Sequence, residues 1–490
     1  MGCAKKGAVA EMSDSGRNWD VIVCGAGSSG MPAAIFAAKR GARVLLVDAA
    51  EEVGGTLHLA GGHMSAADTR LQEARGIHDS PDEHYRDVMR ISRGTANDEL
   101  LRLAVDNAAD TLHWLLDLGF EVSPECPAIV YGHEAYSIPR TYYGREKAIS
   151  ILKVVRPELF RLVAKADITL ELRTRVTALR IEADRVVGIE VVGPDGRART
   201  ELGSNIVLTT GGYAANEAMF QRFSGNYPLF TQAYPYSQGN GFQMVLDLGG
   251  EVRYGEYFLP TYGRVKDPKD PARIAHLTVM TPQTRQPWEI HVNLDGTRFG
   301  AEDDPSPDSR ERTLMRQRDL TFWVIYDEAI RRQAPNLFIN ISDGDLEALW
   351  NRNPSFVRSD SLADLAARTG LSEGNLTATV DGYNASVAAN KDSLGRKHLP
   401  ATIGEAPFYA VMHHGISVVG FAGVRVAPDL RVVRRDGTTM QNLYVAGEML
   451  GSAMKGNSFA SGMAVTPALT FGRLLGSRLL QWADQSVAAE

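Results

Sequence analysis

Cysteine is scarce in this chain of 490 residues, which has only Cys3, Cys24 and Cys126. These positions are odd in number, lie far apart and form no CxxC or metal-ligand pattern. We therefore expect reduced thiols, as in a cytoplasmic protein, rather than a disulfide framework. Cys24 lies in an apolar strand pattern, where a small buried side chain is the expected role.

Long hydrophobic runs and basic blocks are missing as well. No stretch of about eighteen apolar residues occurs, so we expect no membrane span. Residues 1–18 are polar and small and lack an apolar segment of signal-peptide length, which predicts a disordered tail. The 52 Lys and Arg against 59 Asp and Glu give a net charge of −7, which argues against nucleic acid as a partner. Together these features indicate a cytoplasmic globular protein.

A glycine turn follows the apolar run Asp20–Cys24, and a helical pattern over 31–40 follows the turn. In this strand, turn and helix, Gly25 permits the tight turn and Gly27 lets the backbone approach a pyrophosphate. Gly30 allows close packing of helix and strand, and the helix N-terminus offers N–H groups to the phosphates. The spacing therefore predicts a dinucleotide site.

A second strand, predicted over 43–47, ends at Asp48, where an acidic side chain can accept hydrogen bonds from ribose hydroxyls. This acid strengthens the dinucleotide reading. The residues expected to contact the nucleotide here are Gly25, Gly27, Ser28, Ser29, Gly30, Asp48 and Ala49.

A second glycine-rich stretch indicates FAD rather than a nicotinamide cofactor. It comprises Gly54, Gly55 and Thr56, followed by Gly61 and Gly62. FAD is long, and its ribitol and ring system must pass very close to backbone, which glycine permits. A plain nicotinamide site has no need of this stretch. The competing interpretation is two ordinary turns.

Three later segments complete the predicted cofactor site. Alternating residues predict a hairpin over 174–191, and a strand over 205–209 leads into a Thr-Gly-Gly turn. Near the end of the chain a strand over 442–446 ends in Gly-Glu, and a helix is predicted over 464–475. The dipole of such a helix stabilises negative charge on a reduced flavin. The expected contact residues are Val176, Thr210, Gly211, Gly212, Gly447, Glu448, Ala464 and Val465.

These motifs, in this order, resemble the flavoprotein family of fumarate reductases, succinate dehydrogenase flavoprotein subunits and 3-ketosteroid dehydrogenases. Further marks are Gly239-Asn-Gly241, Asn293 to Phe299 with Glu302, and Tyr444 to Glu448. The resemblance implies an α/β fold with a split Rossmann-like FAD-binding domain (19–247 and 419–490) and an inserted α+β cap domain (248–418). It also implies a small-molecule substrate held between flavin and cap, and an external electron acceptor or donor.

The chain departs from this family at the positions that recognise dicarboxylates. Those members carry an arginine after a Gly-x-Asn motif, where this chain has Asn457-Ser458, and a histidine before a Gly-Gly turn, where it has Val418-Val419. The segment 452–472 is instead similar to the ketosteroid dehydrogenase branch, in which a tyrosine and a backbone N–H polarise a ketone. By this resemblance Phe459 stands at the tyrosine position, and Gly462 or Met463 stands near the amide position.

The resemblance also implies a proton-transfer group soon after the Arg-Phe-x-x-Glu stretch, an arginine or a tyrosine in relatives. Direct counting reaches Ser306, whereas a short insertion around Pro305–Pro307 would bring Arg310 to this position. We expect Arg310 to transfer the proton, with Asp308 or a solvated loop as the alternatives. Tyr136, in a cluster of tyrosines over 131–143, is a further candidate.

The predicted activity is hydrogen transfer across a CH–CH bond next to a carbonyl. In the similar succinate dehydrogenases a histidine is covalently linked to FAD, and His58 lies a couple of positions away from that site, so we expect noncovalent FAD. Alternatives are an FAD-dependent oxidase or hydroxylase, a reductase for a larger carboxylic acid, and an electron-transfer subunit. The pair His413-His414 has no ligand spacing, so no metal is expected.

Overall fold

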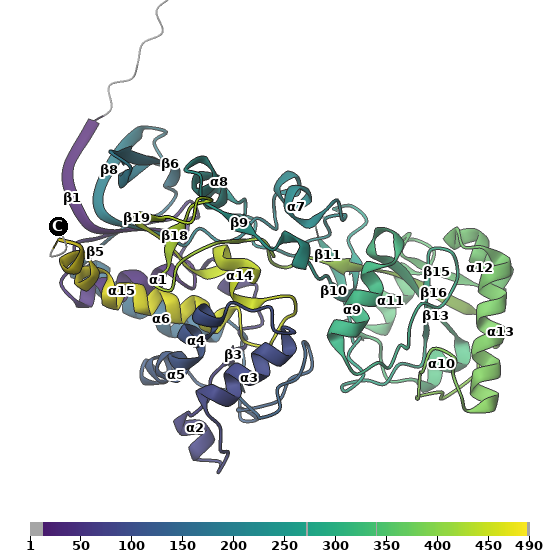
Figure 1. The fold of residues 1–490 in the computed structure, drawn as a ribbon. Coiled ribbons are helices and arrows are strands. Elements are labelled where there is room, and N and C mark those ends of the chain that lie inside the picture. The colour runs from purple at the N-terminus through teal and green to yellow at the C-terminus, as the bar shows by residue number, and fades with distance from the viewer. Residues whose placement is uncertain (1–12, 271–272, 340, 488–490) are drawn as a thin grey trace, which may run out of the picture.

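The computed structural model describes residues 13–270, 273–339 and 341–487, and the chain folds into two lobes that lie side by side (Figure 1). Each lobe has its own sheet and its own buried hydrophobic cluster. The larger lobe contains both ends of the described chain. The smaller lobe, green in Figure 1, is built from the middle of the chain.

The larger lobe is organised around an eight-stranded sheet whose central path runs β18-β19-β8-β1-β2-β5, with β7 and β6 added beyond β8. The neighbours along β19-β8-β1-β2-β5 are parallel, as expected for an α/β fold, and β6 and β7 form the predicted antiparallel hairpin. The strands are β1 (Ser13–Cys24), β2 (Val44–Val47), β5 (Ile168–Glu171), β6 (Arg175–Glu182), β7 (Arg185–Val192), β8 (Ala198–Leu208), β18 (Arg431–Val433) and β19 (Thr439–Val445).

Helices from distant parts of the chain pack together beside this sheet. The helix α1 (Gly30–Lys39) contacts both α6 (Ile149–Ala164) and the C-terminal α15 (Val465–Val487). Small residues make this close packing possible, because a side chain at Gly476 would collide with the α1 backbone at Ala33. Further helices are α3 (Pro81–Ile91), α4 (Asp98–Asp106), α5 (Ala108–Asp117), α7 (Glu217–Ser224), α8 (Asn240–Asp247) and α14 (Gly451–Lys455).

The smaller lobe has a seven-stranded antiparallel sheet, ordered β12-β13-β16-β10-β11-β14, with β15 paired to β16. Its strands are β10 (Thr261–Lys266), β11 (Ile274–Thr278), β12 (Ile290–Asn293), β13 (Thr321–Asp327), β14 (Phe338–Ile339), β15 (Phe356–Ser359) and β16 (Phe408–Ile416). Its helices are α9 (Pro307–Met315), α10 (Glu328–Gln333), α11 (Asp343–Leu349), α12 (Leu362–Thr369) and α13 (Glu373–Ala389).

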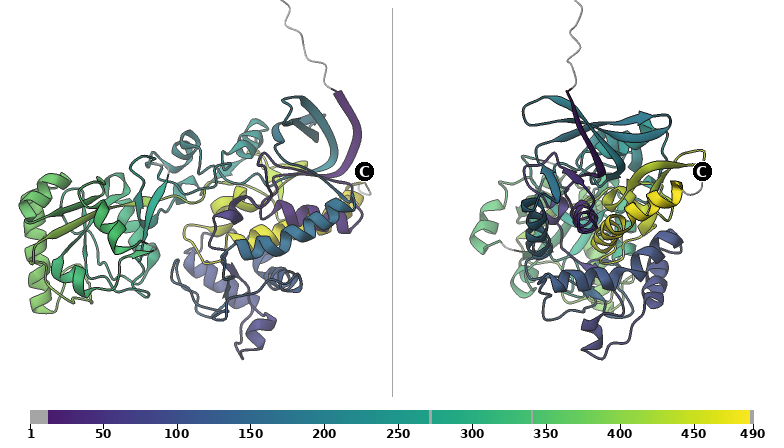
Figure 2. Two further views of the ribbon diagram at one scale, coloured as in Figure 1. Left: turned by 180° about the vertical axis from the view of Figure 1, so that it is seen from behind. Right: turned by 90° about the vertical axis from the view of Figure 1, so that its left-hand side faces the viewer.

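The smaller lobe falls within the predicted insert, 248–418, and its ends connect to the larger lobe through paired segments (Figure 2). Just outside the small sheet, β9 (Val252–Arg253) pairs with β17 (Gly423–Val424). Near the N-terminus, β1 begins at Ser13, inside the segment 1–18 that was predicted as a disordered tail. Residues 1–12 of that segment lie outside the described residues. The exact domain boundaries stay predictions.

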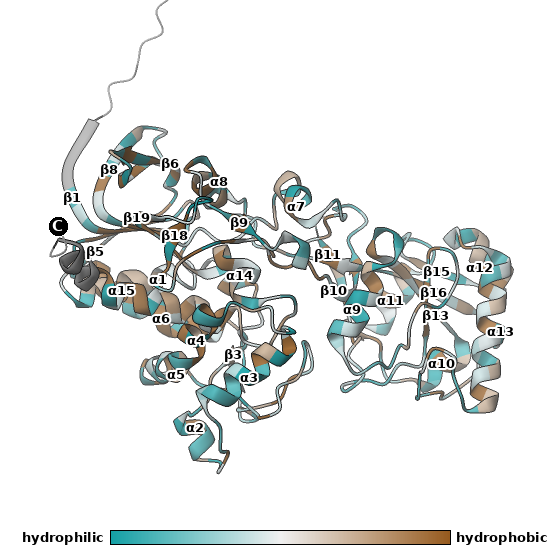
Figure 3. Ribbon diagram, in the orientation of Figure 1, coloured by the Kyte–Doolittle hydropathy of each residue, from teal (hydrophilic) through white to brown (hydrophobic). Residues whose placement is uncertain are grey.

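Burial follows the sequence pattern in both lobes. All four residues of the apolar strand β2 are buried, as expected when both faces of a parallel sheet are covered. All seven residues of β13 are buried as well, including the polar Thr321 and Asp327 at its ends. Figure 3 shows the complementary case, since the short helix α2 (Arg70–Glu73) is hydrophilic. No helix in the described part of the chain is long and apolar enough to cross a membrane.

Candidate active site

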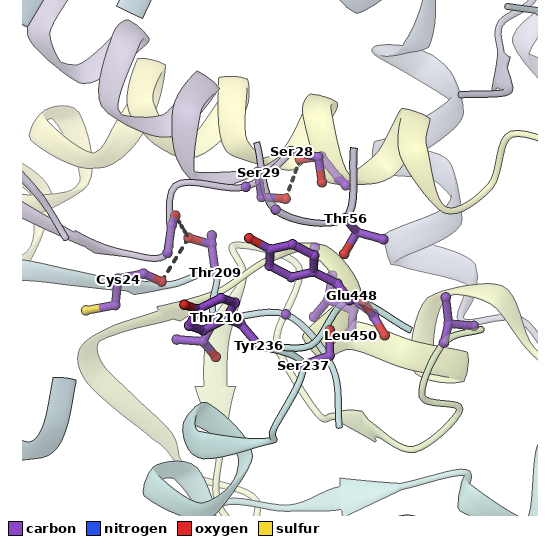
Figure 4. Close-up of a pocket in the computed structure, with 18 of the residues that line it drawn as sticks. Cys24, Ser28, Ser29, Thr56, Thr209, Thr210, Tyr236, Ser237, Glu448 and Leu450 are labelled. Carbon is purple, nitrogen blue, oxygen red and sulfur yellow. Dashed lines mark hydrogen bonds between the residues drawn. The ribbon is translucent and has the colours of Figure 1, made fainter. Parts of the chain in front are cut away.

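The glycine turn between β1 and α1 forms one wall of a pocket in the larger lobe (Figure 4). Gly25 has a φ of +108°, and a Cβ there would lie 2.3 Å from the carbonyl oxygen of Thr209. A Cβ on Gly30 would lie 1.7 Å from the carbonyl oxygen of Gly25. A Cβ on Gly27, in contrast, would meet no atom within 4 Å. Sterics therefore demand glycine at Gly25 and Gly30, whereas Gly27 leaves free space at the pocket wall for a ligand.

Asp48 ties the end of β2 to this turn. One carboxylate oxygen accepts the backbone N–H of Ala26 at 2.6 Å, and the other accepts that of Ala50 at 2.7 Å. Burial raises the pKa of Asp48, while the two N–H groups act in the opposite direction. The side chain also lines the pocket, so its remaining lone pairs face the place predicted for a ribose.

The second glycine stretch contributes both to the pocket wall and to packing. Gly55 and Thr56 line the pocket, whereas Gly54 and Gly62 pack against α6 and the residue before it. Both have positive φ, +124° and +72°, and a Cβ on Gly62 would lie 2.4 Å from the backbone nitrogen of Ala148. These glycines thus bring the stretch close to α6 and hold Gly55 and Thr56 at the pocket.

Residues from the C-terminal segment close the opposite side of the pocket. Glu448 is partly buried, and its Oε1 accepts the backbone N–H of Gly420 at 3.1 Å. Burial raises the pKa of this carboxyl. A Cβ on Gly212 would lie 2.0 Å from the same oxygen, so glycine at this position makes room for the carboxylate. Ala464 and Val465, at the N-terminus of α15, also line the pocket.

The pocket brings together most of the residues predicted to contact the cofactor. Those that line it are Gly25, Gly27, Ser28, Ser29, Asp48, Ala49, Gly55, Thr56, Val176, Thr210, Gly211, Gly447, Glu448, Ala464 and Val465. The predicted residues that are not among the lining residues are Gly30, Gly54, Gly61, Gly62 and Gly212. Apart from Gly61, whose Cβ position is open, each of these stands where a Cβ would collide with neighbouring atoms. Their assignment as direct contacts stays a prediction.

The candidate catalytic residues do not all converge on this pocket. Arg310 lies on α9 in the smaller lobe, with 6% of its surface exposed. Its Nη1 donates to the carbonyl of Met280, and its guanidinium lies 5.4 Å from the ring centroid of Tyr262. Burial lowers the pKa of Arg310, and its buried Nε has no partner among the described residues. Arg310 therefore retains a free N–H but is not among the pocket-lining residues.

Tyr136 is buried, and its hydroxyl is occupied. It donates to the carbonyl of Ser461 at 2.6 Å and contacts the Ser65 hydroxyl at 3.3 Å. Gly462 follows Ser461 with a φ of +84°, and a Cβ there would lie 2.4 Å from the backbone nitrogen of Ser65. Tyr136 thus holds the turn that contains Gly462, which is a positioning role in this arrangement.

Phe459 contacts two residues, His133 and Lys455, that were not predicted from the sequence. Its ring is 4.4 Å from that of His133 and 4.8 Å from Nζ of Lys455, which itself lines the pocket. Tyr236 was not predicted either, and its ring projects into the pocket in Figure 4. Lys455 could have been noticed in the sequence, because it is a charged residue within the small and apolar run 452–463. No sequence pattern marks His133 or Tyr236.

Contacts between the lobes gather at the same place. Ser306, the N-cap of α9, donates to the carboxylate of Glu134, which also accepts the backbone N–H of Asp308 at 3.1 Å. Arg312 donates to the Asn457 side chain at 3.2 Å. The smaller lobe therefore contacts the larger one next to the Phe459 segment. Among the described residues no group of three or more His, Cys, Asp or Glu is placed to hold a metal ion.

Comparison with known proteins agrees with this geometry. A family model described as FAD binding domain matches residues 20–465. The chain is 28% identical over 470 residues to an NADH:fumarate oxidoreductase of Klebsiella pneumoniae (strain 342), covering 94% of this chain but only 47% of that protein. It is 28% identical over 473 residues to a probable fumarate reductase of Shewanella frigidimarina (strain NCIMB 400), covering 94% and 75%.

A solved structure of 3-ketosteroid delta1-dehydrogenase from Sterolibacterium denitrificans has the same fold, with a TM-score of 0.75 and 20% identity over 95% of this chain and 100% of that chain. The residues that line the pocket match the demands of FAD, because glycines leave space for a dinucleotide and an acidic side chain faces the ribose position. The chain therefore belongs to the FAD binding domain family, as an FAD-dependent oxidoreductase related in sequence to fumarate reductases and to a 3-oxosteroid 1-dehydrogenase of Mycolicibacterium smegmatis.

Proposed function

We propose that this enzyme transfers a hydrogen pair across a CH–CH bond next to a carbonyl, acting on a cyclic ketone or a bulkier, less charged acid. One observation carries the proposal. The lining of the FAD pocket continues to Met454, Lys455 and Met463, and α9 contacts the intervening segment at Asn457. A substrate held there would be enclosed between the cofactor and the smaller lobe.

FAD supplies the hydride acceptor or donor for this chemistry when it is bound. The chain's own residues would hold it. The glycine turn would admit the pyrophosphate, Asp48 would accept from the ribose, and the N-terminus of α15, which lines the pocket, would present its positive dipole to the cofactor.

The proposed substrate preference depends on Ser458, the residue that follows Asn457. Ser458 is buried, and its hydroxyl has no partner among the described residues. A serine cannot make the bidentate, charge-assisted contact by which arginine holds a carboxylate. Arg312 is nearby, but its guanidinium is engaged by both carboxylate oxygens of Asp308. We therefore expect fumarate and succinate to be poor substrates.

Arg310 is the group that we propose for proton transfer. It lies one turn after Ser306 on α9, the helix through which the smaller lobe contacts Glu134. Burial lowers its pKa, which eases exchange of a proton with a carbon acid or base. In this role Arg310 gives a proton to the carbon next to the carbonyl during reduction, and takes one from it during desaturation.

Anaerobic spectroscopy of the holoenzyme tests the function. Saturated cyclic ketones and acids are added to oxidised enzyme, and their unsaturated counterparts to dithionite-reduced enzyme freed of excess reductant. We expect at least one cyclic ketone pair to bleach or restore the flavin absorbance, with no comparable rate for succinate or fumarate. Rapid reaction with the dicarboxylates alone would refute the proposal. Reaction with oxygen but with no member of either panel would favour an oxidase.

A further inference from the structure

Lys455 is an ammonium group buried against the FAD pocket. It is the last residue of α14 and is 6% exposed. Its Nζ lies 5.3 Å from the ring centroid of Phe421 and 4.8 Å from that of Phe459. The side chain lines the pocket together with Met454 and Met463. The ammonium of Lys455 thus lies over two aromatic rings, and thioether side chains line the pocket next to it.

The charge of Lys455 is only partly compensated within the chain. The attraction of two aromatic faces for an ammonium is weaker than the cost of burying an ion. Burial accordingly lowers the pKa of Lys455 to about 8, although Glu448 acts in the opposite direction. Among the described residues, the contacts of Nζ are those with the two rings and the longer-range attraction of Glu448, with no hydrogen bond or salt bridge. The donors of Nζ therefore lack an acceptor on a face that opens to the pocket.

We propose that Lys455 binds the oxygen of the substrate's carbonyl or carboxylate, the group conjugated to the carbon–carbon bond that reacts. This inference rests on the proposed function and narrows its substrate class. It assigns a compound with a polar end and an apolar body, because the oxygen meets the ammonium of Lys455 while Met454 and Met463 line the pocket beside it. Arginine and tyrosine are both missing at the neighbouring positions, Ser458 and Phe459.

The chemical consequence of this contact can be stated for the reductive direction. Hydride from the reduced flavin would add to the β-carbon, and the electron pair of the double bond would move toward the oxygen, which becomes negatively charged. Lys455 keeps its proton and stabilises this charge by a charge-assisted hydrogen bond. The proton from the proposed donor, Arg310, then completes the product at the α-carbon. Desaturation follows the same steps in reverse, with the oxidised cofactor taking the hydride.

Equilibrium dialysis of the FAD-loaded protein tests the contact without turnover. The probes are 4-nitrophenol, at a pH where it is ionised, and 4-nitroanisole, which has the same flat body and no charge. We compare the wild type with Lys455→Met and Lys455→Arg, and use Lys153→Met as a control, because Lys153 is an exposed lysine paired with Glu146. The flavin spectrum of each variant verifies that FAD is bound.

We expect Lys455→Met to bind the phenolate about ten- to a hundredfold more weakly than the wild type, as for a lost hydrogen bond between charged groups. Lys455→Arg and Lys153→Met should stay within a few-fold of wild type, and 4-nitroanisole should bind all forms alike. Equal phenolate binding by Lys455→Met would overturn the inference. So would a loss confined to FAD affinity, because the cofactor would then be the acceptor for Nζ.

The two proposals fail in distinguishable ways. If the wild type binds phenolate through Lys455 but no unsaturated ketone or acid reoxidises the reduced flavin, the oxygen site stands and the proposed CH–CH activity is wrong. If cyclic ketones react and Lys455→Met leaves both phenolate binding and the reaction rate unchanged, the activity stands and the role of Lys455 is wrong.

Discussion

Replacing Asp48 with alanine should weaken FAD binding and also loosen the turn that forms the site. The carboxylate accepts two short backbone hydrogen bonds, from Ala26 at 2.6 Å and from Ala50 at 2.7 Å. Both alanines are buried. The substitution leaves these two N–H groups without their acceptor. Each unsatisfied donor costs about 1–3 kcal/mol, less wherever water enters from the pocket.

Loss of the ribose contact adds to this effect in the holoenzyme only. A hydrogen bond to a charged acceptor contributes about 1.5–3 kcal/mol, so we expect the dissociation constant of FAD to rise roughly ten- to a hundredfold. Thermal unfolding of the apoprotein measures the loss of stability. Titration with FAD, followed by its fluorescence at a temperature where both proteins are folded, measures the loss of FAD affinity.

Asp20→Ala is the matched control for this experiment. Asp20 lies in the neighbouring strand β1 and accepts the backbone N–H of Arg43, just before β2, at 2.7 Å, but it is not among the pocket-lining residues. The control should lower stability and leave the affinity for FAD near that of wild type. Wild-type FAD affinity in Asp48→Ala would refute the ribose assignment, even if the variant unfolds at a lower temperature.

Four further outcomes are expected. Arg310→Lys should keep FAD bound and slow turnover about a hundredfold, whereas Arg316→Lys, at the exposed end of the same helix, should be near wild type. Comparable rates for both variants would remove Arg310 from proton transfer. Gly27→Ala should leave apoprotein stability unchanged, because its Cβ meets no atom within 4 Å, but should weaken FAD measurably in the same titration. Burial raises the pKa of Glu311 to about 8, so the native state holds a proton that the unfolded chain releases near its ordinary pKa. Stability should therefore fall as the pH rises toward 8, by at most about 1.4 kcal/mol per pH unit, and Glu311→Gln should flatten this dependence in urea unfolding at pH 6 and 8. Acid treatment should release intact FAD into solution, and flavin that stays with the precipitated protein would contradict noncovalent binding.

Much of the cofactor site could be predicted from the sequence because its signals are local. The order of strand, glycine turn and helix depends on neighbouring residues and on the backbone conformations that glycine alone permits, as at Gly25 with its φ of +108°. The hairpin over 174–191 and the strand before Gly447 were predictable for the same reason, since alternation is visible within a few residues. The predicted strands and helices of this site are present in the structure.

Contacts between distant residues were decided by the tertiary structure alone. Glu134 and Ser306 are 172 positions apart, yet their side chains join the two lobes. The burial of Arg310 and the position of Lys455 depend in the same way on which elements pack around them. A sequence pattern records the period of a helix or strand but not its partner, because partners are selected by the packing of whole surfaces. The sequence by itself therefore determined the family and the cofactor, while only the folded chain determined which cation faces the pocket.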